Sequence, residues 1–96
     1  MTAFNDLDPL LHSQLRLAVM SILMNVESAE FVYLKEQTNA TAGNLSVQLD
    51  KLSTAGYIQV DKSFRGKKPV TTCRITKAGI QAFRQYVKDL EKYLKP

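Results

Sequence analysis

Apolar residues in the first quarter of the chain recur at intervals of three and four positions, which is the period of an amphipathic helix. We predict a first helix of about four turns. It is expected to start at Asp8-Pro9, because Asp caps free N–H groups and Pro fits the first helical position. Residues 1–8 are expected to form a flexible leader. The apolar stripe of this helix consists of Leu11, Leu15, Ala18, Val19, Ile22, Leu23 and Val26.

Two shorter helices are predicted next. Ser28 is suited to cap a second helix near Ala29 to Thr38, with its apolar side chains facing the core. Residues 39–41 form a turn, and Thr41 is a plausible N-cap for a third helix from Ala42 to about Ala55, which Gly56 ends. The buried face of this third helix consists of Leu45, Leu49 and Leu52.

After Gly56 the pattern changes to partial alternation. Residues 57–64 and 70–76 read as two strands, joined by a charged loop, Arg65-Gly66-Lys67-Lys68-Pro69. Thr76 can cap a final helix from Lys77 to about Leu94. The order helix, helix, helix, hairpin, helix predicts one domain over residues 1–96. The fold class is mainly α with a small β-hairpin (α+β): a winged helix-turn-helix with three helices, a β-wing and a C-terminal dimerisation helix.

Charge is distributed unevenly along the chain. The net charge is +4, but residues 1–61 carry three Lys/Arg and seven Asp/Glu, whereas residues 62–96 carry ten and two. A basic block is expected where phosphates bind. Such a block can also be a solvated surface, or lysines that protect strand edges from aggregation. The candidate DNA contacts of the wing are Lys62, Arg65, Gly66, Lys67, Lys68 and Arg74.

The third helix turns polar side chains away from its leucines. Asn and Gln can bind adenine bidentately, Val47 could contact a thymine methyl group, and Lys51 could reach a phosphate or a guanine. An ordinary solvated helix face would have a similar composition. The candidate DNA contacts of this helix are Thr41, Asn44, Ser46, Val47, Gln48 and Lys51.

The final helix carries a second apolar stripe, with steps of three and four residues that are typical of a coiled-coil seam. We expect it to pack against a second copy of the chain, so that two recognition helices lie about one DNA turn apart. Alternatively, one stripe completes the core of the monomer. The candidate dimer-interface residues are Ile80, Phe83, Tyr86, Val87, Leu90, Tyr93 and Leu94.

Residues 41–52 (TAGNLSVQLDKL), followed by Gly56-Tyr57-Ile58, resemble the recognition-helix signature of winged-helix regulators of the MarR and ArsR type. Residues 62–69 (KSFRGKKP) and 75–79 (ITKAG) resemble the wing and the start of the next helix, and the resemblance covers most of the chain. It implies a homodimeric transcription factor whose third helix and wing bind operator DNA. Many relatives have a basic residue where this chain has Val47 and Gln48.

Other kinds of site receive little support from the sequence. Cys73 is the only cysteine and His12 the only histidine, so neither a disulfide nor a metal site is expected. Cys73 alternates in phase with Ile75 and is expected in the core, whereas a redox switch needs an exposed thiol of low pKa. We predict no enzyme activity, no cofactor and a cytoplasmic location without a membrane span, while the sequence leaves a small-molecule effector open.

The leading hypothesis is therefore a homodimeric transcriptional regulator that binds specific double-stranded DNA. The third helix would enter the major groove, and the basic wing would contact the backbone or the minor groove. The alternative is a winged helix used for protein–protein interaction, since a fold does not fix a function.

Overall fold

The structure is a computed structural model that describes residues 4–95, and within them it contains four helices and a three-stranded antiparallel sheet. The predicted α+β winged helix-turn-helix is confirmed. In order, the elements are α1 (Gln14–Leu23), β1 (Ala29–Glu30), α2 (Phe31–Thr38), α3 (Ala42–Thr54), β2 (Ile58–Arg65), β3 (Lys68–Ile75) and α4 (Lys77–Leu94).

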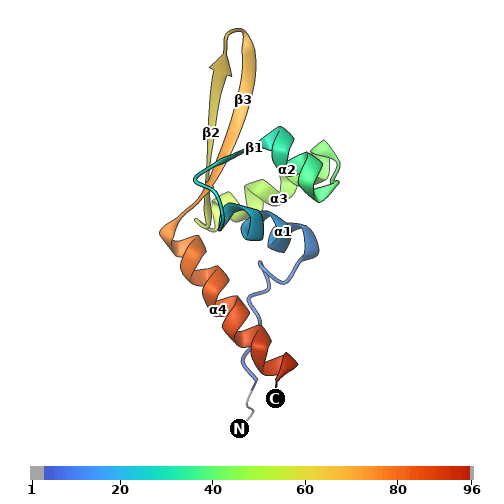
Figure 1. Ribbon diagram of the computed structural model, residues 1–96, viewed down its shortest axis with the longest axis vertical. Helices are drawn as coiled ribbons and strands as arrows, with labels where there is room; N and C mark the ends of the chain where they lie inside the picture. Colours follow the sequence, from blue (N-terminus) through green and yellow to red (C-terminus); the bar gives the residue numbers. More distant parts are fainter. Residues whose placement is uncertain (1–3, 96) are drawn as a thin grey trace.

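The molecule is elongated, with extents of 57 × 25 × 21 Å. Helices α1, α2 and α3 form a central body, from which the β2–β3 hairpin projects at one end and α4 at the other (Figure 1). The core lies where the three helices meet the base of the sheet, and the predicted inward leucines of α3 belong to it. Its fully buried side chains are Leu11, Val19, Met20, Leu23, Leu34, Leu45, Leu52 and Cys73.

The predicted start of the first helix is wrong. Residues 9–13 form separate turns, and α1 begins only at Gln14. Asp8 caps the preceding turn and not the helix. Its side chain accepts a hydrogen bond from Leu10 N at 2.9 Å, and its backbone oxygen accepts one from His12 N at 2.8 Å. Ser13 then has an extended backbone (φ −150°, ψ 127°), which separates the turn from α1. The helix also ends earlier than predicted, at Leu23.

The predicted second helix is wrong in its first two residues, because Ala29 and Glu30 form strand β1. This strand pairs antiparallel with β3, opposite Cys73 and Thr72. The backbone of Ala29 and Glu30 thus joins a strand more than 40 residues away, which local helix signals cannot show. Helix α2 begins at Phe31 with Glu30, not Ser28, at its N-cap position. The sheet order is β1-β3-β2.

The predicted five-residue loop of the hairpin is also wrong, because the strands extend further. Arg65 pairs with Lys68, so only Gly66 and Lys67 form the turn. Gly66 has φ +66°. The two-residue turns that match the twist of a hairpin need a positive φ at their first central residue, which glycine adopts without steric cost.

Helix α4 starts close against the base of the hairpin. Thr76 Oγ1 accepts from Gly79 N at 3.0 Å, so the predicted cap is confirmed, and it donates to Gly56 O at 2.6 Å. A Cβ atom on Gly79 would lie 2.1 Å from Tyr57 O. Only glycine therefore allows this helix to approach the backbone just before β2 so closely.

The first described residues lie along the far end of α4 (Figure 1). Asn5 Nδ2 donates to Asp89 Oδ1 at 3.0 Å, and Tyr93 OH donates to Asn5 O at 2.7 Å. The rings of Phe4 and Tyr93 are 4.8 Å apart. Residues 4–8 of the predicted leader thus have no helix or strand, but Phe4 and Asn5 contact α4, while residues 1–3 lie outside the described residues. No helix within residues 4–95 is long and apolar enough to span a bilayer.

Candidate nucleic-acid interface

Helix α3 divides its side chains between the core and solvent as predicted. Its three leucines are at most 3% exposed. Of the six predicted contacts, five are exposed, namely Thr41, Asn44, Ser46, Val47 and Lys51, while Gln48 is half-buried. Thr41 Oγ1 accepts from Asn44 N at 3.2 Å and so caps the helix, as the sequence predicts. This oxygen is therefore engaged by the helix itself.

A chain of hydrogen bonds runs across the N-terminal half of α3. Arg16 Nη1, on α1, donates to Gln48 Oε1, and Gln48 Nε2 donates to Asn44 Oδ1 at 2.9 Å. Arg16 is further held by its Nε, which donates to Leu10 O at 2.6 Å. The three side chains line a hollow of about 410 Å³ between α1 and α3. Both amide oxygens of the predicted adenine-binding pair are thus engaged within the protein.

Sequence analysis missed Arg16. It supplies a basic group next to the recognition helix, although α3 itself lacks one at Val47 and Gln48. A signal was present, since Arg16 is the only charged residue of α1. The pattern of apolar residues showed that Arg16 lies off the buried stripe, but not that it points toward α3.

The basic residues of the wing lie on both faces of the hairpin. The strand register places Lys62 on the same face as the core residues Ile58 and Cys73. Arg65 and Lys68 pair with each other on the opposite face, which also carries Arg74. Gly66 and Lys67 form the tip. The predicted cluster is therefore exposed along its whole length, but its charges do not share one side.

Two of the five wing cations have acidic partners. Arg65 Nη2 lies 3.0 Å from Glu30 Oε2, and Arg74 Nε lies 4.0 Å from Asp61 Oδ2. Both pairs are exposed, so each contributes only about 0–1 kcal/mol to stability. Among residues 4–95, Lys62, Lys67 and Lys68 have no carboxylate within 4.0 Å. Of these three, Lys67 and Lys68 lie at the tip of the hairpin and are the most available cations of the wing.

Helix α3 and the wing meet in a cleft of about 260 Å³. Lys62 and Thr71 line it from the hairpin, and Ser46 and Asp50 line it from α3. The outward face of α3 and the core-side face of the wing therefore form one continuous surface. Asp50 places a negative charge beside Lys62 at this junction.

The predicted dimer-interface residues of α4 fall into three classes. Tyr86 is 3% exposed and lies within the protomer, where its hydroxyl is 2.9 Å from His12 Nδ1. Ile80, Phe83 and Leu90 are half-buried. The remaining three are exposed, at 38%, 44% and 70%: Val87, Tyr93 and Leu94.

Cys73 lies in the core, as predicted, with no exposed surface. Burial, and secondarily the negative charge of Asp61, raise the pKa of its thiol to about 11. The thiol is therefore protonated at neutral pH, which is the opposite of what a redox switch requires. Within residues 4–95, no three His, Cys, Asp or Glu side chains lie close enough together to hold a metal ion.

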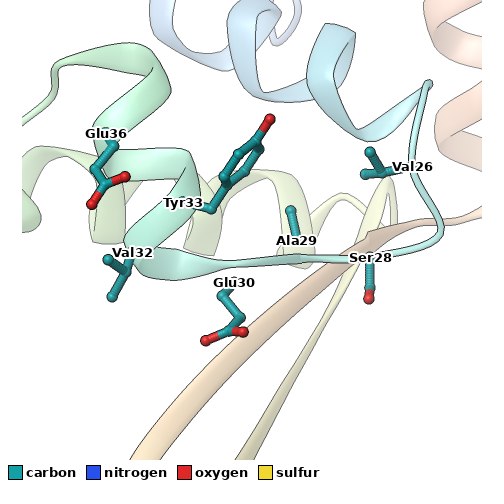
Figure 2. A pocket seen from close by; sticks show the side chains of 7 residues that line it. All are labelled: Val26, Ser28, Ala29, Glu30, Val32, Tyr33 and Glu36. Carbon is teal, nitrogen blue, oxygen red and sulfur yellow. The ribbon is translucent and has the colours of Figure 1, made fainter.

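A further hollow, of about 410 Å³, lies between α2 and the segment before it (Figure 2). Tyr33 and Val32 line it and are 46% and 61% exposed. Glu30 points away from Tyr33, toward the side of the hairpin, where it binds Arg65 (Figure 2). The lining is thus shallow and has few polar groups that converge on one point.

A family profile described as a winged helix DNA-binding domain matches residues 15–94. The chain belongs to this family. The resemblance to winged-helix regulators that the sequence predicts is therefore confirmed. An uncharacterized protein of Methanocaldococcus jannaschii is 35% identical over 79 residues, which cover 82% of this chain and 86% of that protein.

Solved structures share this winged helix fold. A transcriptional regulator homologue from Pyrococcus horikoshii OT3 superposes with a TM-score of 0.82 at 24% identity, over 88% of this chain and 84% of that one. Bacillus subtilis PadR, solved in complex with operator DNA, gives a TM-score of 0.69 at 17% identity, over 78% of this chain and 48% of PadR. At these identities the likeness shows the fold.

Proposed function

We propose that this winged helix protein is a homodimeric transcriptional regulator that binds specific sequences of double-stranded DNA. One observation carries the proposal: an exposed polar helix face and a basic hairpin lie side by side and are joined by the cleft at Ser46 and Lys62. An isolated polar helix or an isolated basic hairpin would each have a simpler explanation. A continuous surface of both kinds fits a DNA groove and the phosphates that flank it.

In this proposal α3 enters the major groove with its N-terminal half, where Asn44 and Val47 are exposed. The wing then lies over the adjacent backbone or minor groove, with Lys67 and Lys68 nearest to phosphates. The complex of PadR with operator DNA supports DNA binding by this chain, because PadR has the same fold.

The dimer in this proposal forms through α4. This helix projects from the body (Figure 1). Its helical spacing places a stripe of apolar residues next to the position of the buried Tyr86. Val87 and Leu94 lie in that stripe and are exposed, and Phe83 and Leu90 are only half-covered. A second copy would bury these side chains in a coiled-coil-like contact.

Selection of bound sequences from a random duplex pool, at near-physiological salt, tests DNA recognition. We expect enrichment of a palindromic motif with half-sites about 10 base pairs apart, bound roughly 10³-fold or more tightly than random DNA. No enrichment, with only weak and salt-sensitive binding, would reject specific recognition and favour a protein–protein role for the surface.

Solution mass tests the dimer. Val87→Glu with Leu94→Glu places charges in the exposed stripe without touching the core, so we expect a folded monomer. Lys88→Glu, a charge change at an exposed polar position of the same helix, is the control and should leave the dimer intact. A wild-type monomer, or a double variant with unchanged mass, would contradict an interface on α4.

A further inference from the structure

Arg16, Gln48 and Asn44 are joined by a series of hydrogen bonds, and chemistry fixes which group donates and which accepts in each of them. A guanidinium group only donates hydrogen bonds. The Gln48 atom that faces Arg16 must therefore be its oxygen, and the atom that faces Asn44 must be its nitrogen. Since that nitrogen donates, the Asn44 atom that receives the bond must be Oδ1. The orientation of both amides thus follows from Arg16 alone.

The direction of these hydrogen bonds decides which donor and acceptor groups α3 presents to DNA. Both amide oxygens are used inside the protein, and among residues 4–95 Asn44 Nδ2 has no acceptor. Asn44 is exposed, and it lies in the first turn of α3. Recognition helices approach bases with their N-terminal residues. The group that Asn44 presents there is a donor.

The donor and acceptor roles in this series of hydrogen bonds are also difficult to reverse. The bond from Arg16 is charge-assisted, and such bonds are roughly twice as strong as neutral ones. Arg16 is held from its other side by Leu10 O. A bidentate contact with adenine needs an amide that offers both an oxygen and a nitrogen to the base. In the observed orientation Gln48 Oε1 accepts from Arg16 and Asn44 Oδ1 accepts from Gln48, so only the second lone pair of Asn44 Oδ1 remains for such a contact.

We infer that Arg16 is a specificity-determining positioning residue, which orients the two amides so that Asn44 donates to guanine rather than pairing with adenine. This inference rests on the proposed function. Guanine presents two neighbouring acceptors in the major groove, N7 and O6. Adenine presents one acceptor, N7, beside an amino group, thymine presents one acceptor, O4, beside a methyl group, and cytosine presents an amino group. The two donors of the Asn44 amide nitrogen therefore find two neighbouring acceptors only on guanine, whereas on adenine one of them meets an amino group, donor against donor. Arg16 acts through Gln48 and need not touch DNA.

The decisive variant is Gln48→Glu. Glu accepts from Arg16 with one oxygen and presents an acceptor to Asn44 with the other, so Asn44 must turn over and donate. Its Oδ1 then faces outward. The new charge lies beside Arg16, and the bond from Arg16 to Leu10 O is unaffected. Gln81→Glu makes the same charge change at an exposed position of α4 and is the matched control.

Selected motifs are compared for these proteins, and Asn44→Ala identifies the base pair that Asn44 contacts, because discrimination is lost there. We expect guanine at that position for the wild type and for Gln81→Glu. For Gln48→Glu we expect adenine or cytosine, with a change in preference of about tenfold or more. Arg16→Met should reduce the preference for guanine, and Arg16→Lys, which still only donates, should keep it.

The outcomes separate the two proposals. A wild-type motif that keeps the same base in Gln48→Glu, or that has no guanine at the Asn44 position, overturns the inference and leaves the proposed function standing. An Asn44→Ala variant that changes no position overturns it as well. If the wild type enriches no motif, both proposals fail. Gln48→Glu decides the question even if Arg16→Met does not fold, which thermal unfolding detects.

Discussion

Helix α3 and the β2–β3 wing both expose polar groups on one surface, but they hold them differently. The polar side chains at the start of α3 are tied to one another and to α1, on a helix anchored by three buried leucines. The wing extends into solvent, and its tip carries lysines that lie far from the core (Figure 1). Ordered groups suit recognition of base edges, where geometry matters. Charges on long, exposed side chains suit phosphates, where sign and reach matter most.

The largest expected effect comes from a substitution that loosens α3 and so removes its difference from the wing. Leu45 has no exposed surface, so Leu45→Ala leaves a cavity and should lower the free energy of unfolding by about 2–5 kcal/mol. Val47→Ala, on the exposed side of the same helix, is the control and should change stability little. Chemical denaturation measures both. Equal effects would mean that α3 is not anchored through this side chain.

Removing the free charges of the wing should have the next largest effect. Lys67→Ala with Lys68→Ala is expected to weaken binding to every DNA sequence alike and to lower the salt slope of binding by about 2, because two phosphate contacts are lost. Lys88→Ala with Lys92→Ala removes the same charge from α4 and should leave the slope close to that of the wild type. A wing variant with relaxed sequence preference would contradict the division of roles.

These two regions also differ in how far the sequence predicted them. The buried leucines and the Thr41 cap of α3 are local and periodic, and the prediction was confirmed at each. The wing was correctly predicted as a hairpin, but the ends of its strands were not, since Arg65 and Lys68 pair in the sheet rather than lie in a loop. Strand ends depend on partners across the hairpin, which a pattern along one strand does not specify.

Contacts between distant residues account for the other differences. Arg16 is 32 positions from Gln48, and Glu30 is 35 positions from Arg65. Nothing in the local composition around either residue indicates its partner. The division of α3 into a buried and an exposed face was therefore predictable from residue type and spacing, whereas the hydrogen bonds of its polar side chains were not.

A smaller and more local effect is expected from Asn44→Ala. Loss of the Asn44 side chain should reduce discrimination at a single base pair of the motif by about tenfold, with little change in the salt slope of binding. Asn25→Ala is the control, because Asn25 is exposed outside the candidate interface and bonds only locally, to Ser21 O. Competition binding against single-base variants of the selected motif measures the difference. A uniform loss of affinity would place Asn44 with the wing lysines in function.

The smallest expected effect concerns the ion pair between Glu30 of β1 and Arg65 of the wing. Glu30→Gln removes the partner of Arg65, and because that pair is exposed the free energy of unfolding should fall by no more than about 1 kcal/mol. The freed Arg65 adds a cation to the wing, so affinity for DNA of any sequence should rise and the salt slope should increase by about 1. Glu27→Gln makes the same charge change at a neighbouring exposed residue and separates the general gain in positive charge from the release of Arg65. Titration at several salt concentrations distinguishes them. If both variants gave the same slope, the ion pair would not restrain Arg65, and Arg65 would already be available to phosphates in the wild type.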